Sequence, residues 1–176
     1  MNKEISKFLS MVLRHDPSSI GLTLSLNGWA DIHELIAKAE IRGKSFSYDE
    51  LIEVVRTNDK QRFTISADGQ RIRAAQGHSI AVDLALAPIK PPLILFHGTA
   101  VANVEAILRD GLRPGLRQQV HLSADQDTAR MVGLRHGKPA VLSVAAGQMH
   151  LEGFKFFLSD NGVWLIDAVP PQFIEL

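Results

Sequence analysis

The sequence contains no cysteine, which excludes disulfide bonds, thiolate metal sites and a cysteine nucleophile. It also lacks an excess of either charge, with 19 Lys and Arg against 19 Asp and Glu. Any site for a polyanion must therefore be local. No apolar run reaches the roughly 18 residues of a membrane span. We expect a soluble, cytoplasmic protein without a membrane segment.

Familiar nucleotide and metal motifs are missing as well. There is no Gly-x-Gly-x-x-Gly string and no Walker loop, so a Rossmann or P-loop nucleotide site is not expected. No His-x-x-x-His pair and no acidic cluster has the spacing of metal ligands. We predict no metal cofactor.

The 176 residues, 45% of them hydrophobic, can form one large domain or two small ones. Pro88, Pro91 and Pro92 forbid a helix and favour an extended linker. We therefore predict two modules, residues 1–80 and 93–176, joined by a proline-rich linker over 81–92. The predicted fold class is α+β.

The first module has the capping patterns of three helices. Asn2 is a plausible N-cap for the first helix. Asp31 with Glu34, and Ser47 with Glu50, have the spacing of capping boxes that open the second and third helices. Alternation over residues 62–66, an Asp68-Gly69 turn and a return strand from Arg71 then predict a hairpin. Three helices followed by a hairpin form a winged-helix layout.

The second module is predicted to be rich in strands. Residues 93–96 read as a buried strand, and a helix over 101–108 follows and stops at Gly111. Ser123 with Gln126 has the spacing of another helix cap. Further strands are expected in three apolar runs, residues 140–144, 154–158 and 163–166.

Arg14 and His15 lie at the predicted end of the first helix, before Asp16-Pro17. Two cations at that position can simply compensate the helix dipole. They can also clamp a phosphate, because arginine supplies a fixed fork of donors and histidine an adjustable one. The sequence alone leaves both interpretations open.

Arg62 begins the predicted hairpin, which carries more basic than acidic residues. Such an excess is compatible with a merely solvated wing. It is also how a winged-helix module contacts a sugar-phosphate backbone. A rigid strand would hold the side chain of Arg62 in place, which favours a role in binding.

Two imidazoles are predicted at strand ends in the second module. In His97-Gly98-Thr99, the glycine would let a nucleotide approach the backbone, and Thr99 could cap the next helix. His121-Leu122-Ser123 repeats this arrangement, and Arg117 lies four residues before His121. The alternatives are a satisfied core histidine and a surface arginine.

Several strings, taken together and in order, resemble the NAD-dependent RNA 2'-phosphotransferases, the tRNA 2'-phosphotransferase family. The strings are Leu13-Arg14-His15-Asp16-Pro17, Gly28-Trp29, Gln61-Arg62-Phe63, Ile72-Arg73-Ala74, Gln76-Gly77-His78-Ser79, His97-Gly98-Thr99, Val120-His121-Leu122-Ser123, Gly137-Lys138-Pro139 and Asn161-Gly162-Val163-Trp164-Leu165. The resemblance covers nearly the whole chain.

This resemblance implies a winged-helix RNA-binding lobe followed by an ADP-ribosyltransferase-like, split-sheet lobe that binds NAD. The implied activity transfers an internal RNA 2'-phosphate to NAD, which is consumed, through an ADP-ribosylated RNA intermediate. The implied catalytic residues are Arg14, His15, Arg62 and Arg117. The implied NAD-binding residues are His97, Gly98, Thr99, His121 and Ser123.

The partner implied is a tRNA-like RNA with an internal 2'-phosphate, bound by a monomer. Two positions depart from the family pattern, since Gln119 replaces a common histidine and Ala75 a commoner polar residue. Two other functions stay open, namely an ADP-ribosyltransferase acting on terminal phosphates or protein, and a non-enzymatic winged-helix regulator that senses a nucleotide.

Overall fold

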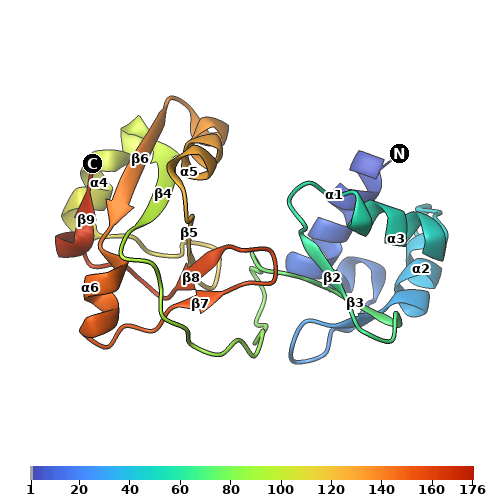
Figure 1. Ribbon diagram of the computed structural model, residues 1–176. Helices are drawn as coiled ribbons and strands as arrows, with labels where there is room; N and C mark the ends of the chain where they lie inside the picture. The colour runs from blue at the N-terminus through green and yellow to red at the C-terminus, as the bar shows by residue number, and fades with distance from the viewer. Residues whose placement is uncertain (1) are drawn as a thin grey trace. The chain divides into compact units, whose positions relative to one another are not determined.

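The computed structural model describes residues 2–176, which divide into two compact units between Ala85 and Leu86. Within the described residues the fold is mixed α+β, with six α-helices and three small antiparallel sheets (Figure 1). Each unit has its own cluster of buried apolar side chains. The predicted α+β class is confirmed at this level.

The first unit is built on three helices, α1 (Asn2–Arg14), α2 (Ile32–Ile41) and α3 (Tyr48–Arg56). A short 3-10 turn, η1 (Pro17–Ile20), follows α1. The helices bury apolar residues at helical spacing, so that each contributes one face to a common core. Leu9, Leu35 and Leu51 are fully buried there.

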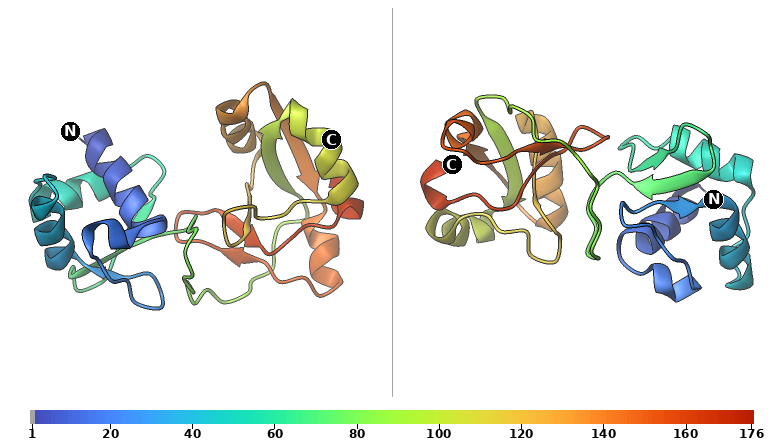
Figure 2. Two further views of the ribbon diagram at one scale, coloured as in Figure 1. Left: turned by 180° about the vertical axis from the view of Figure 1, so that it is seen from behind. Right: turned by 90° about the horizontal axis from the view of Figure 1, so that it is seen from below.

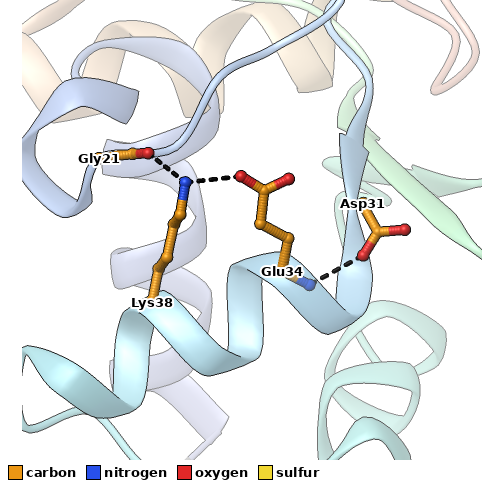
Figure 3. Close-up of polar contacts among 4 residues, drawn as sticks. All are labelled: Gly21, Asp31, Glu34 and Lys38. Carbon is orange, nitrogen blue, oxygen red and sulfur yellow. Dashed lines mark hydrogen bonds and ion pairs between the residues drawn. The ribbon is translucent and has the colours of Figure 1, made fainter.

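Local hydrogen bonds define where α2 and α3 begin. Asp31 accepts a hydrogen bond from the backbone N–H of Glu34 at 2.8 Å, so the predicted N-cap of α2 is confirmed (Figure 3). The Glu34 carboxylate, however, pairs with Lys38, whose amine also donates to the Gly21 carbonyl. At α3 the predicted capping box of Ser47 and Glu50 is complete.

A three-stranded antiparallel sheet completes the first unit in the order β1-β3-β2. Its strands are β1 (Ala30–Asp31), β2 (Phe63–Ile65) and β3 (Arg71–Ala74). The predicted hairpin at Asp68-Gly69 joins β2 and β3, with Gly69 at a φ of 71°. Residues 62–66 and 71–73 therefore form a hairpin as expected.

The second unit contains two sheets, each of three antiparallel strands. The first sheet consists of β4 (Leu95–Ala100), β6 (Pro139–Val144) and β9 (Ile174–Glu175), in the order β4-β6-β9. The second sheet consists of β5 (Val120–Leu122), β8 (Trp164–Ile166) and β7 (Phe157–Leu158), in the order β5-β8-β7. Backbone hydrogen bonds between Phe96 and Ser123 connect the start of β4 with the end of β5.

The second unit also contains three helices. Helix α5 (Gln126–Gly133) packs on β4 and β6, and α4 (Val101–Asp110) packs on β4 and the short turn η3 (Pro171–Phe173) (Figures 1 and 2). Helix α6 (Ala146–Leu151) follows β6, and the 3-10 turn η2 (Leu134–His136) follows α5.

The structure corrects several predicted boundaries. Helix α1 already includes Asn2, so Asn2 is not its N-cap. The cap of α5 is Asp125, which accepts from the Thr128 N–H at 2.7 Å, and not Ser123. Ser123 is held in backbone pairing with Phe96, and this tertiary pairing outweighs its local capping tendency.

The predicted strand over 93–96 is displaced toward the C-terminus. Leu93 is 80% exposed, and β4 begins only at Leu95. The strand continues to Ala100 because the whole segment pairs with β6, from Leu95 opposite Val144 to Ala100 opposite Pro139. Helix α6 and strand β9 were not predicted. No helix within residues 2–176 is long and apolar enough to cross a bilayer.

Candidate functional site

Arg14 and His15 lie at the C-terminal end of α1. Arg14 is the last helical residue and is half-buried, whereas His15 is exposed. The chain turns directly after them, because Asp16 caps η1 by accepting from the Ser19 N–H. The helix end therefore fixes the backbone of both residues while His15 remains accessible to a ligand.

The segment Gly77–Ser79 contacts both of these residues from a distant part of the sequence. The Ser79 N–H donates to the Arg14 carbonyl at 2.9 Å. The Ser79 Oγ lies 2.8 Å from Nδ1 of His15. A Cβ added to Gly77 would lie 3.5 Å from Nε of Arg14, so the backbone at Gly77 runs against the guanidinium. Ser79 was not among the predicted site residues, although its string was noted.

His78 is buried between these contacts, with 2% of its surface exposed. Burial, together with the positive charges of Arg14, His15 and Arg73, lowers the pKa of His78 to about 4. Its Nε2 has no hydrogen-bond partner. His78 is therefore a neutral residue at pH 7, surrounded by cations.

Arg62 is half-buried and lies directly before β2, which begins at Phe63, one residue later than predicted. Its N–H donates to Oδ1 of Asn58 at 3.2 Å, and its carbonyl accepts from Ala75 at 2.9 Å. The preceding residue, Gln61, has a φ of 43°, and a positive φ is uncommon for any residue other than glycine. Strained backbone of this kind persists where the surroundings hold it.

Arg62 and the Arg14-His15 pair are thus held by one segment, since Ala75 bonds to Arg62 and Ser79 bonds to Arg14. A second basic group lies on β3, where the guanidinium carbons of Arg71 and Arg73 are 5.3 and 4.6 Å from the centre of the Trp29 ring. The predicted basic hairpin is therefore partly engaged in cation–π contacts.

In the second unit, the structure brings His97 and His121 together. Nδ1 of His97 lies 3.1 Å from the backbone carbonyl of His121. Because a carbonyl only accepts, Nδ1 of His97 carries the proton and donates. Burial lowers the pKa of His97, so the ring is neutral at pH 7 with Nε2 unprotonated.

Arg117 is exposed and contacts His121 from a loop. Its Nη1 lies 2.8 Å from Nδ1 of His121. A guanidinium has no lone pair to offer, so Arg117 donates and Nδ1 of His121 accepts. The His121 ring is then neutral with its proton on Nε2. The two imidazoles therefore carry opposite tautomers.

The sequence predicted both histidines at strand ends, and the structure places both within strands. His97 lies in the middle of β4, opposite Leu142, and His121 is the central residue of β5, opposite Leu165. The longer ladders of β4 and β5 explain the difference. Ser123, directly after β5, remains next to β4 through its two backbone bonds with Phe96.

Gly98 and Thr99 have packing roles that the sequence did not reveal. A Cβ on Gly98 would lie 1.6 Å from the Ala129 carbonyl oxygen, because α5 crosses β4 at this point. Thr99 is buried and accepts a hydrogen bond from the Asn103 side chain at 3.2 Å. The N-cap of α4 is Ala100, so the predicted capping role of Thr99 is wrong.

Among residues 2–176, no group of three or more His, Asp or Glu side chains could hold a metal ion. The arginines and histidines predicted for the site fall into two sets. The first unit holds Arg14, His15 and Arg62 on one supporting segment, and the second joins His97, His121 and Arg117 by direct hydrogen bonds. The first set suits an anion, and the second offers neutral donors and acceptors beside one cation.

Comparison with known proteins identifies the family. The model of the RNA 2'-phosphotransferase, Tpt1/KptA family matches residues 1–168. The chain is 60% identical to a probable RNA 2'-phosphotransferase of Agrobacterium fabrum, over 100% of this chain and 95% of that protein. Probable RNA 2'-phosphotransferases of Hahella chejuensis and Streptomyces griseus are 55% and 53% identical, over 99% and 98% of this chain and 94% and 95% of theirs.

A match of this length and identity settles membership. The chain belongs to the RNA 2'-phosphotransferase family. The resemblance stated from the sequence strings is confirmed.

Proposed function

We propose that this protein transfers an internal RNA 2'-phosphate to NAD and consumes the NAD. The products are RNA with a free 2'-hydroxyl, ADP-ribose 1'',2''-cyclic phosphate and nicotinamide. The observation that carries the proposal is the family match over residues 1–168, and the family uses NAD to remove a 2'-phosphate.

The finer assignments belong to the same proposal. Residues 1–80 act as a winged-helix lobe that binds RNA, and residues 93–176 act as an ADP-ribosyltransferase-like lobe that binds NAD. The RNA is tRNA-like and the protein acts as a cytoplasmic monomer. Three helices with a hairpin in the first unit, and two small sheets in the second, support these lobe assignments.

We assign the RNA phosphates to Arg14, His15, Arg62 and Arg117. A guanidinium presents two parallel donors to phosphate oxygens, and it keeps its charge throughout the working pH range. The support of Arg14 and Arg62 by backbone bonds favours this role, because fixed donors stabilise developing charge without rearranging.

We assign NAD to His97, Gly98, Thr99, His121 and Ser123. The two opposite tautomers fit this substrate, because unprotonated Nε2 of His97 can accept from a ribose hydroxyl while Nε2–H of His121 can donate. Neutral imidazoles also avoid repelling the positive nicotinamide ring. Gly98 also lets α5 pack against the strand, because a Cβ there would meet the Ala129 carbonyl oxygen.

In the first step, an oxygen of the RNA 2'-phosphate attacks the anomeric carbon of the nicotinamide ribose. The carbon–nitrogen bond breaks, and nicotinamide leaves with the electron pair. The phosphate is already an anion at neutral pH, so this step needs no base. The segment 161–165, which includes most of β8, has no Glu, and a carboxylate there would repel an incoming phosphate.

In the second step, the 2''-hydroxyl of the ADP-ribose attacks phosphorus and the bond to the RNA 2'-oxygen breaks. The hydroxyl proton is released and the departing RNA oxygen gains one. Negative charge concentrates at phosphorus, where the arginines act by electrostatic stabilisation. His15 is assigned to donate to the phosphate or to move the proton.

The test is to incubate the protein with NAD and a short RNA carrying one internal 2'-phosphate, and to follow the products by mass spectrometry. The expected result is loss of the phosphate with release of nicotinamide and ADP-ribose 1'',2''-cyclic phosphate. An ADP-ribosylated RNA that never resolves would instead indicate a terminal-phosphate or capping activity. Absence of NAD consumption would favour the nucleotide-sensing regulator.

A further inference from the structure

We infer that Ser79 is a positioning residue for the reaction, which holds the imidazole of His15 by Nδ1 and so directs its Nε2 edge to the phosphate. The inference rests on the proposed role of His15. Ser79 is 64 residues from His15 in the sequence, yet its Oγ is 2.8 Å from Nδ1, within a normal hydrogen-bond distance.

Ser79 is itself fixed, which allows it to orient another residue. Its N–H donates to the Arg14 carbonyl at 2.9 Å, so the backbone of Ser79 is anchored on the end of α1. Its hydroxyl is also directed at this carbonyl, at 3.5 Å. The two bonds attach Ser79 to the residue directly before His15, so the hydroxyl and the imidazole belong to one rigid arrangement.

The direction of the hydroxyl determines the tautomer of His15. A hydroxyl has one proton and two lone pairs. When the Ser79 proton points to the Arg14 carbonyl, Oγ accepts from Nδ1–H of His15. Nδ1 then keeps its proton in both charge states of the ring, and Nε2 is the nitrogen that gains or loses one. An exposed ring held this way presents its proton-exchanging nitrogen in a constant direction.

The environment of Ser79 supports this role. His78 is buried at 2% exposure and anchors the segment next to Ser79. Gly77 brings the backbone against the Arg14 guanidinium, so residues 77–79 contact or adjoin two of the proposed phosphate ligands, Arg14 and His15. Ser79 is exposed, so its hydroxyl contributes little to the core of the unit.

The first experiment measures the tautomer directly, by nitrogen NMR of the histidine side chains in the full-length protein without substrates. Comparison with His15→Gln assigns the signal. In the wild type, neutral His15 is expected with its proton on Nδ1. In Ser79→Ala it is expected as a mixture dominated by the Nε2–H form that free imidazole side chains prefer. An unchanged tautomer in Ser79→Ala would overturn the inference without touching the proposed function.

The second experiment measures turnover of 2'-phosphorylated RNA with NAD. Ser79→Ala is expected to lower kcat about 10-fold, the effect of one lost hydrogen bond, with little change in KM for NAD. Ser79→Thr keeps the hydroxyl and should restore most of the rate. Equal losses in both variants would show that size and not the hydroxyl matters, which would overturn the inference.

Ser47→Ala is the matched control. It removes a hydroxyl that accepts a hydrogen bond in the same unit, at the N-cap of α3, away from His15. It should lower the melting temperature through loss of a cap and leave the His15 tautomer and kcat unchanged. If the wild type itself fails to remove the phosphate while the tautomer shift occurs, the proposed function fails and the positioning contact stands.

Discussion

The guanidinium of Arg117 donates a hydrogen bond to Nδ1 of His121 over 2.8 Å. This contact fixes a neutral His121 with its proton on Nε2, and it sets the opposite tautomer from that of His97. One residue assigned to phosphate and one assigned to NAD are therefore directly coupled. Removing Arg117 is expected to weaken the stabilisation of negative charge at phosphorus and to release the orientation of the His121 ring.

Replacing any one of Arg14, Arg62 and Arg117 by alanine should stall the second step. The expected loss is on the order of 10²–10³ in rate, because each guanidinium is assigned to the charge that develops at phosphorus. Time courses with labelled RNA should show ADP-ribosylated RNA accumulating.

Arg113→Ala, a change of an exposed arginine near Arg117 in sequence, is the control and should turn over normally. Arg117→Lys tests geometry, since lysine keeps the charge but lacks the planar fork. If all three alanine variants lose RNA binding and form no intermediate, the arginines dock the RNA and the catalytic assignment is wrong.

His97→Ala should weaken NAD binding selectively. The variant loses the Nδ1 donor to the His121 carbonyl and the Nε2 acceptor assigned to the ribose. We expect KM for NAD to rise about 10-fold, the effect of roughly one hydrogen bond. Steady-state kinetics with each substrate varied in turn measures this. His150→Asn, on α6, is the control, and a rise confined to KM for RNA would contradict the assignment.

Gly98→Ala should destabilise the second unit by about 3 kcal/mol, at the upper end of the cost of overpacking. The added Cβ would lie 1.6 Å from the Ala129 carbonyl oxygen, so α5 must shift. Urea unfolding followed by Trp164 fluorescence in a Trp29→Phe background measures the free energy of unfolding of this unit.

Gly115→Ala serves as its control, because Gly115 has a φ of 62° but open space around its Cβ position. Gly115→Ala should therefore destabilise the unit by only about 1 kcal/mol, the cost of placing an alanine in a left-handed backbone conformation. Equal effects at the two glycines would mean that α5 yields easily, and the packing explanation of Gly98 would fail.

The stability of the first unit should fall as the pH falls from about 6.5 toward 4. Burial and the nearby Arg14, His15 and Arg73 lower the pKa of His78 to about 4. The unfolded chain therefore takes up a proton at His78 in this range before the folded protein does. Crossing the whole range costs on the order of 3 kcal/mol, and the contribution is complete above pH 6.5.

Unfolding of a Trp164→Phe variant, followed by the fluorescence of Trp29, measures this pH dependence. In His78→Gln, the free energy of unfolding should depend less steeply on pH between pH 6.5 and 4. His33→Gln removes an exposed imidazole from the same unit and should leave the slope as it is. A slope that survives in His78→Gln would place the titrating group elsewhere.

The sequence by itself determined the features that depend on neighbouring residues. The cap of α2 at Asp31, the capping box of Ser47 and Glu50, and the Asp68-Gly69 turn are all formed as predicted. Each depends on hydrogen bonds or backbone preferences within three or four residues, so the local sequence is sufficient. The same holds for the family, because its strings are a property of the sequence alone.

Only the tertiary structure decided which distant residues meet. His15 contacts Ser79, 64 residues away, and His97 contacts the carbonyl of His121, 24 residues away. Ser123 could have capped α5, but its pairing with Phe96 took precedence. Strand register and helix packing set these contacts, and both depend on the burial of whole faces and not on local propensity. Gly98 is the clearest case, because the sequence could not show that α5 packs against it and leaves no room for a Cβ.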